Sequence, residues 1–193
     1  HGCSRTDAGV HAKMFCCNFR TDKGIPLEKI PAALNANLPR DIVVYHAEEK
    51  EPDFHARYSC KKKEYVYCVC NTAYRDPFLE NRAYFYRFPL HEKDLNRAAQ
   101  DFIGTHDFTS FCSSGSSVDS KIRTITDFSV VRKQDLVLFR VSADGFLYNM
   151  VRIMVGSLLN IAEGKFPENS VPLMIQAKDR KAAGITAPPQ GLY

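Results

Sequence analysis

The sequence predicts an α+β protein, with a mostly antiparallel sheet and helices packed on one face of it. Residues 64–70 alternate between two faces as a strand does, and residues 122–133 and 136–143 predict two long strands that form a hairpin around Gln134 and Asp135. Apolar residues at helical spacing mark 91–103 and 148–163. Strands and helices are mixed without strict alternation, which favours a helix-covered antiparallel sheet.

The first third of the chain predicts shorter elements. Residues 14–19 read as a mostly buried strand, and residues 27–36 as a helix that ends before Pro39. A second apolar run, residues 41–45, predicts another strand, and residues 51–57 a linker.

The later elements follow in order. In the strand 64–70, Tyr65, Tyr67 and Val69 are expected on one face. The helix 91–103 ends at Gly104, and the serine-rich residues 113–117 predict a loop. The helix 148–163 ends at Gly164, and Ser170 is expected to cap a last helix that reaches residue 178.

Composition sets broad limits. The 193 residues are 45% hydrophobic and 25% charged, which is enough for a real core in one large domain or two small ones. No apolar run approaches the roughly 20 residues that cross a bilayer, and the first residues show no apolar signal region. The net charge of +4 permits an acidic partner such as RNA without requiring one.

The seven cysteines do not predict a metal site. No Cys-x-x-Cys pair occurs, and the number is odd. We therefore expect reduced, mostly structural thiols in a cytosolic protein. The alternative, a zinc-binding structural protein, would require bound metal.

One motif near the start carries chemistry. Arg5 precedes Asp7 by two residues in a turn that Gly9 loosens, so that the guanidinium can orient the carboxylate. Taken alone, this pattern is also typical of a surface ion pair. The full stretch is Arg5-Thr6-Asp7-Ala8-Gly9-Val10-His11-Ala12.

This stretch resembles the catalytic loop of the TruA family of tRNA pseudouridine synthases, which isomerise uridines 38 to 40 in the tRNA anticodon arm. Six further segments resemble family signatures in the family's order. They lie at residues 34–42, 53–59, 65–67, 104–111, 150–156 and 187–193. Family members begin with a further strand and helix before the catalytic loop. We therefore expect a truncated chain, and for this chain alone both turnover and inactivity are left open.

The resemblance implies a role for each matching residue. Asp7 would be the catalytic carboxylate, acting on C1′ or C6 or on a sugar proton. Tyr65 would contact the target base, whereas Tyr67 is expected in the core. Arg152, in an apolar helix face, would pair with Asp7, because an unpaired charge is costly to bury. Arg5 would help to position the flipped nucleotide.

Basic residues beside the strand 64–70 are candidates for contacts with RNA phosphates, which require charge but not sequence. They are Arg57, Lys61, Lys62 and Lys63, and a solvated strand entry explains them almost as well. The histidines of the matched segments, His11, His55 and His106, are expected to make structural hydrogen bonds.

The resemblance also implies an organisation and partners. Two pseudo-related halves would flank a catalytic cleft, with residues 1–56 as the remainder of the first half and 57–193 as the second. The partners would be tRNA and a second copy of the chain, in the cytoplasm and without a cofactor. The alternative is a binding module that grips tRNA without turnover.

Overall fold

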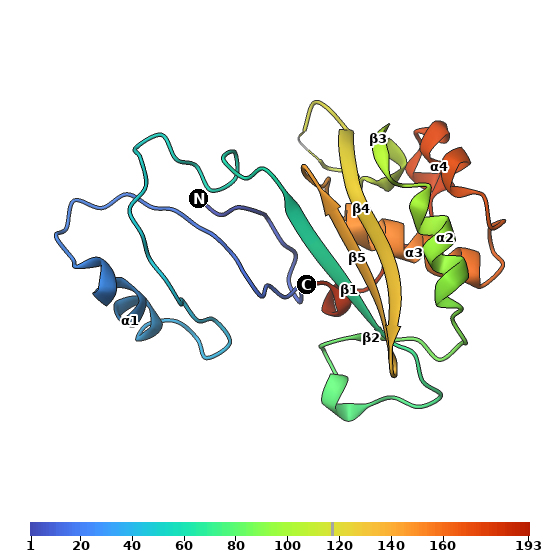
Figure 1. Ribbon diagram of the computed structural model, residues 1–193, viewed down its shortest axis with the longest axis horizontal. Coiled ribbons are helices and arrows are strands. Elements are labelled where there is room, and N and C mark those ends of the chain that lie inside the picture. The colour runs from blue at the N-terminus through green and yellow to red at the C-terminus, as the bar shows by residue number, and fades with distance from the viewer. Residues whose placement is uncertain (117) are drawn as a thin grey trace. The chain divides into compact units, whose positions relative to one another are not determined.

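The computed structural model describes residues 1–116 and 118–193, which form two compact units (Figure 1). The first unit comprises residues 1–5 and 15–60, and the second comprises residues 6–14 and 61–193. Residues 6–14, which carry Asp7, therefore make their contacts with the second unit. The expected division of the sequence at residues 56 and 57 stays a prediction.

A five-stranded sheet forms the centre of the second unit, as the sequence predicts. The strands run in the order β2-β1-β5-β4-β3, and every neighbouring pair is antiparallel except β1 and β2. The predicted hairpin is present between β4 and β5, where Gln134 takes a left-handed φ of 53°. The strands are β1 Lys63–Cys70, β2 Tyr84–Phe85, β3 Gly104–Asp107, β4 Ile122–Lys133 and β5 Leu136–Ala143.

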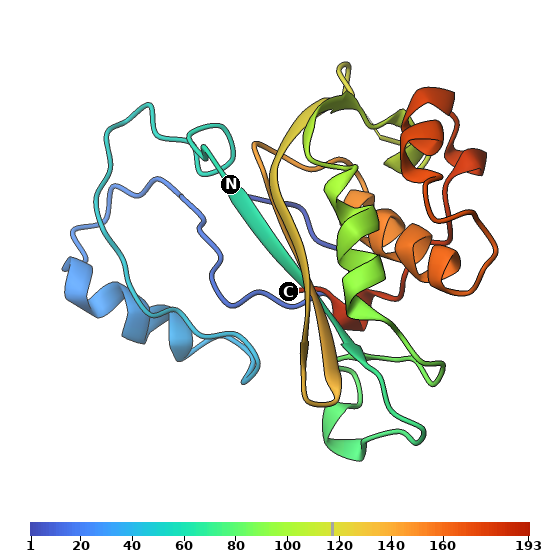
Figure 2. The same ribbon diagram turned by 45° about the vertical axis from the view of Figure 1, so that its right-hand side comes forward.

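Three helices cover one face of this sheet (Figure 2). They are α2 Glu92–Gln100, α3 Met150–Ala162 and α4 Val171–Ala177. The alternation of the strands aims one set of side chains at the helices. Tyr67 and Val69 of β1 and Phe139 of β5 are each 0% exposed. The predicted helix-covered sheet is therefore confirmed, and it contains the core of this unit.

Details at the helix ends differ from expectation. Helix α2 ends at Gln100, and Ile103 beyond it is 36% exposed. Ser170 occupies the N-cap position of α4, but its side chain makes no cap hydrogen bond, and its buried Oγ has no hydrogen-bond partner among the described residues. The cap predicted for Ser170 is therefore wrong, although its helix is present. The strands β2 and β3 were not predicted, because both are short and weakly patterned.

The first unit contains one helix, α1 Ile30–Asn35, preceded by the 3-10 turn Leu27–Lys29. This confirms the helix predicted at 27–36. Both strands predicted for the first third are wrong. Of residues 14–19, all of which are described, only Cys17 forms a β-bridge, an isolated one with Gly2, and no strand ladder is present there. In the run 41–45, both backbone groups of Val44 bind the Asn35 side chain, at 2.7 and 2.9 Å.

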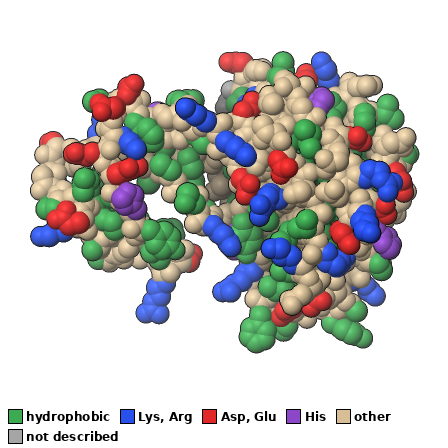
Figure 3. Space-filling view, in the orientation of Figure 1, with side chains coloured by type: hydrophobic (Ala, Val, Ile, Leu, Met, Phe, Trp, Pro, Cys, Tyr) green, Lys and Arg blue, Asp and Glu red, His purple; other side chains and the backbone are tan. Residues whose placement is uncertain are grey.

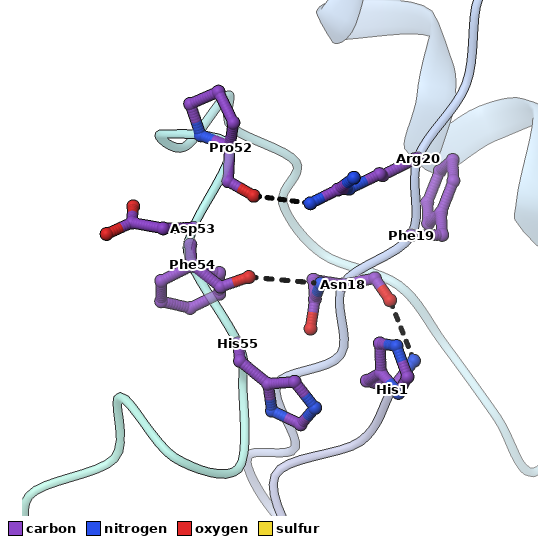
Figure 4. A pocket seen from close by; sticks show the side chains of 8 residues that line it. All are labelled: His1, Asn18, Phe19, Arg20, Pro52, Asp53, Phe54 and His55. Atoms are coloured by element: carbon purple, nitrogen blue, oxygen red, sulfur yellow. Dashed lines mark hydrogen bonds between the residues drawn. The ribbon is translucent and has the colours of Figure 1, made fainter.

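Apolar side chains of the first unit remain at the surface (Figure 3). Phe19 is 58% exposed and Tyr45 83%. Two segments of this unit, residues 18–20 and 52–55, line a pocket and are joined by hydrogen bonds (Figure 4). Arg20 donates to the Pro52 carbonyl at 2.6 Å, and Asn18 Nδ2 donates to the Phe54 carbonyl at 3.4 Å. Polar contacts rather than buried surface thus connect residues 18–20 with residues 52–55.

The loop predicted at residues 113–117 is described through residue 116, where it forms a turn, and Ser117 lies outside the described residues. Within the described ranges, no helix has the length and apolar character needed to cross a membrane.

Candidate active site

The loop that carries Asp7 is a tight turn. The Val10 N–H donates to the Asp7 carbonyl at 3.2 Å, and Gly9 has a φ of 82°. This left-handed conformation is open to glycine at no steric cost. A Cβ at Gly9 would also lie 3.3 Å from Cγ of Pro189. The turn is therefore specific for glycine and packs closely against the last residues of the chain.

The last residues of the chain tie this loop to the sheet. Tyr193 exchanges two backbone hydrogen bonds with Val66 of β1, both 2.8 Å long, and the Leu192 carbonyl accepts from the His11 N–H at 2.9 Å. The His11 ring stacks on Tyr193, with centroids 4.6 Å apart and planes 19° from parallel. Backbone and ring contacts thus connect the loop to the last two residues of the chain, and these residues are in turn bonded to β1.

Asp7 forms an ion pair with Arg152 of α3, as expected from the sequence. Arg152 Nη1 lies 2.7 Å from Asp7 Oδ2. The Arg152 side chain is only 14% exposed, whereas that of Asp7 is 36% exposed. A guanidinium at this depth needs acceptors, because burying a charge without them is costly.

Arg152 has two further acceptors. Its Nε donates to the Ala187 carbonyl at 2.7 Å, and its Nη1 donates to Oδ1 of Asn149 at 2.9 Å. The Ala187 N–H in turn donates to the Arg152 carbonyl at 3.0 Å. The side chain is therefore fixed in one orientation, and the carboxylate that it holds is fixed with it.

The start of α3 explains this placement. Arg152 lies in the first turn of α3, between Val151 and Ile153, which are 4% and 0% exposed. Asn149, the residue before the helix, takes a left-handed φ of 60°, and its Nδ2 donates to Ser113 Oγ at 3.0 Å. Asn149 was not predicted as part of the site. The sequence signal that could have found it is a polar residue at the entry of an apolar helix.

Tyr65 lies on β1 and contacts Phe146, which lies in the connection between the end of β5 and the start of α3. Its ring meets Phe146 edge to face, with centroids 5.0 Å apart and an interplanar angle of 89°. Phe146 precedes Asn149 by three residues, so that one short segment contacts both Tyr65 and Arg152. Tyr67 is fully buried, as predicted, and donates to the Pro188 carbonyl at 2.7 Å; burial raises the pKa of its phenol.

The other predicted site residues are placed differently. Arg5 belongs to the first unit and is exposed, and Arg57 of the same unit is half-buried. In the second unit, Lys61 and Lys62 are exposed and Lys63 is half-buried. Contacts of these residues with RNA stay predictions. On the face that Figure 3 shows, basic side chains of the second unit are interspersed with acidic ones.

The three histidines of the matched segments make the structural hydrogen bonds expected of them. His11 Nε2 lies 2.9 Å from the Asn81 carbonyl, and His106 Nε2 lies 3.1 Å from the Ile103 carbonyl. His55 Nδ1 accepts a hydrogen bond from the Arg57 N–H at 3.2 Å. In the part of the chain that the structure describes, no group of three or more histidine, cysteine or acidic side chains has the geometry to bind a metal.

Comparison with known proteins places this geometry in a context. A family described as tRNA pseudouridine synthase matches residues 1–59 and 98–193. The tRNA pseudouridine synthase A of Thermoanaerobacter sp. strain X514 is 48% identical over 192 residues, which cover 100% of this chain and 79% of that protein. The enzyme of the same name from Bacillus subtilis strain 168 is 47% identical over 189 residues, 98% of this chain and 76% of that protein. The family match includes Asp7 and Arg152, whereas Tyr65 falls between its two segments.

Proposed function

Because the chain belongs to the tRNA pseudouridine synthase family, an isomerase family, we propose that it converts uridine to pseudouridine at positions 38–40 of the tRNA anticodon arm. The observation that carries this proposal is the ion pair of Asp7 with Arg152, formed inside the family's matched segments. The pair supplies a carboxylate of fixed orientation, which is what a reaction at one atom of a nucleotide requires.

The reaction rearranges one nucleotide. The bond from ribose C1′ to uracil N1 breaks, the base turns, and C5 joins to C1′, while C5 loses a proton and N1 gains one. Substrate and product contain the same atoms, and nothing is oxidised or reduced, so that we propose no cofactor. A side-chain carboxylate suits this chemistry, because it can act as a nucleophile or accept a proton.

Asp7 is the catalytic residue in this proposal. Its Oδ2 is bound to Arg152, and about a third of the side chain is exposed, so that we assign Oδ1 to the nucleotide. Attack at C1′, attack at C6 and removal of a sugar proton all remain open to it. Arg152 would compensate the charge of the carboxylate and prevent its rotation.

Tyr65 and Arg5 would contact and position the target base. Chemistry on a stacked nucleotide requires that it leave the stack, at a cost of about a few kcal/mol. Tyr65, whose ring contacts Phe146 edge to face, would contact the flipped uracil, and Arg5 would help to displace or position it. Arg57 and Lys61–Lys63 would bind tRNA phosphates, so that binding should weaken as salt rises. We further propose a homodimer in the cytoplasm.

Tritium release from an anticodon-arm RNA labelled at uridine C5 tests the proposal. We expect release by the unchanged protein and a loss of at least about a thousandfold in Asp7→Asn, which keeps the side chain's shape but not its charge. Asp22→Asn, a change at an exposed carboxylate of the first unit, is the matched control and should retain full activity.

Two results would contradict the proposal. Full turnover by Asp7→Asn would remove the aspartate from the mechanism. Salt-sensitive tRNA binding by the unchanged protein, without any tritium release, would favour the alternative of a binding module.

A further inference from the structure

Four of the seven cysteines belong to the first unit, and the structure holds all seven as thiols. These four are Cys3, Cys16, Cys17 and Cys60. The active-site proposal uses none of them. In the sequence, Cys3 precedes and Cys16 follows the loop that carries Asp7, and the backbones of the two cysteines contact each other directly.

The contact is a short antiparallel register. Gly2 and Cys17 form the bridge, the Cys3 N–H donates to the Cys16 carbonyl at 2.8 Å, and the Asn18 N–H donates to the His1 carbonyl at 2.8 Å. His1 also donates to the Asn18 carbonyl (Figure 4). This pattern makes Gly2 and Cys17 a non-hydrogen-bonded pair and puts Cys3 directly opposite Cys16 at the neighbouring hydrogen-bonded position, where the Cys3 N–H makes one of the two bonds of such a pair.

The register selects one thiol pair. Side chains directly opposite each other point to the same face, and successive residues point to opposite faces. Cys3 and Cys16 therefore share a face, while Cys17 projects from the other one, opposite a glycine. The Cα atoms of a hydrogen-bonded antiparallel pair are about 5.5 Å apart, inside the range of roughly 4.4–6.8 Å that a disulfide spans.

We propose that Cys3 and Cys16 are a redox site, in which a peroxide converts the two thiols into a disulfide that closes residues 3–16, Asp7 among them, into a covalent ring. The thiolate of the exposed Cys16 attacks one peroxide oxygen, which gives a sulfenic acid and one water. The Cys3 thiolate then displaces hydroxide from that sulfur, and the hydroxide takes up a proton to become the second water. Two thiols are oxidised, and one peroxide is reduced to two waters.

The surroundings of Cys16 predict how this reaction depends on pH. Partial burial of the thiol raises the pKa of Cys16, and so do, in decreasing order, the Cys3 and Cys17 thiols, the Glu48 carboxylate and the Cys60 thiol. Since the thiolate is the nucleophile, little reactive form is present at neutral pH. The rate of disulfide formation should therefore increase as the pH rises toward that pKa.

Peptide mapping tests the proposal without RNA, so that its outcome is independent of the proposed function. Treatment with hydrogen peroxide, alkylation of the remaining thiols and digestion with trypsin release residues 1–5 and 14–20 as separate peptides, because Arg5, Lys13 and Arg20 are cleavage sites. We expect these two peptides to be joined, with the loss of two hydrogen atoms, and to separate again after reduction with dithiothreitol.

Matched serine variants identify the sulfurs. Cys16→Ser should abolish the joined peptide, and Cys17→Ser, the adjacent thiol on the other face, should keep it. A joined peptide that persists in Cys16→Ser would overturn the proposal. So would a link from residues 1–5 to the peptide 58–61, which carries Cys60, or oxidation of Cys16 to a sulfinic acid without any link.

Discussion

The two units use their apolar residues in different ways. In the second unit, side chains from the sheet and from α3 form one core, where Phe139, Ile153 and Leu158 are each 0% exposed. In the first unit, all of which is described, Ala56 is the single buried residue. Hydrogen bonds such as the one from the Ala56 N–H to Asn18 Oδ1, 3.0 Å long, join its segments instead.

This difference separates two sources of stability. Burial of a large apolar side chain contributes about 1.5–3 kcal/mol, whereas a typical hydrogen bond contributes about 0.5–1.5 kcal/mol net. The second unit is therefore stabilised by an apolar core, as an ordinary domain is. The ion pair of Asp7 with Arg152 belongs to this unit. The first unit depends on a few directional contacts.

The largest contrast should come from truncating one phenylalanine in each unit. Phe139→Ala removes a fully buried ring of β5 and should lower the free energy of unfolding by about 3–5 kcal/mol. Phe19→Ala removes a ring that is 58% exposed and should change it by about 0.5 kcal/mol or less. Urea denaturation monitored by circular dichroism measures both. Equal losses would mean that the first unit also depends on apolar packing.

A pair of glycines sharpens the same contrast at the level of single atoms. A Cβ at Gly156 of α3 would lie 1.9 Å from the Ile185 carbonyl oxygen, so that backbone must move. Gly156→Ala should cost about 2–3 kcal/mol. A Cβ at Gly24 of the first unit would have no neighbour within 4 Å, and Gly24→Ala should be neutral or stabilise by up to about 1 kcal/mol.

Thermal unfolding of both glycine variants provides the measurement. A Gly156→Ala protein as stable as the unchanged chain would show that α3 and the segment at Ile185 can separate without cost. A marked loss in Gly24→Ala would show that residues around it pack more tightly than the open surroundings indicate.

The same contrast explains which elements the sequence predicts. The periodic patterns of β1, β4, β5 and α3 were correct because each pattern is satisfied by burial against the others. The runs 14–19 and 41–45 have comparable apolar character but form no ladder, since a strand also needs a neighbour's backbone over several residues. Within the described residues, the run 14–19 has only the isolated bridge to residues 1–3, and the run 41–45 has no strand beside it. For Val44, the Asn35 side chain takes that place, and no periodicity of the sequence encodes such a contact.

The candidate site was predictable only in part, for a related reason. The match to family signatures led to Asp7 and Arg152, and an arginine inside an apolar helix stretch already demands a partner. The Ala187 carbonyl, Asn149 and Phe146 were not foreseen. The Ala187 carbonyl and the Asn149 side chain accept hydrogen bonds from Arg152, and the Phe146 ring contacts Tyr65. All three contacts depend on tertiary structure.

Changing the form of the charge at Arg152 is expected to have an intermediate effect. Arg152→Lys keeps the positive charge but loses the planar set of donors that reaches Asp7, Asn149 and Ala187 together. We expect tritium release to fall by about 10–100-fold, which corresponds to roughly 1.4–2.8 kcal/mol, with the fold retained. Unchanged activity would mean that charge alone orients Asp7.

Arg140→Lys is the matched control for this change. The Arg140 side chain is 56% exposed, and its Nε lies 3.9 Å from Oε1 of Glu64. An exposed pair at this distance contributes little, and the variant should keep full activity and stability. A loss similar to that of Arg152→Lys would indicate a general effect of replacing arginine in this unit.

The smallest effect concerns one carboxylate in each unit and depends on pH. Hydrogen bonds from Lys165, Tyr86 and Asn160 lower the pKa of Glu163. A lowered pKa stabilises the fold above the ordinary glutamate value of about 4.3, and this contribution disappears as the pH falls through the lower value of the folded state. Glu163→Gln should therefore be less stable than the unchanged protein at pH 7, by about 1 kcal/mol or less, and equal to it in acid.

Glu48→Gln provides the comparison from the first unit. Glu48 pairs with Lys50 at 3.0 Å, but both side chains are about half exposed, and solvent screens such a pair. Its loss should leave the denaturation midpoint unchanged at pH 7 and at pH 3. If Glu48→Gln showed the same pH-dependent loss as Glu163→Gln, exposed ion pairs would stabilise the first unit as much as the partly buried network stabilises the second. The contrast between the two units would then be one of apolar packing alone.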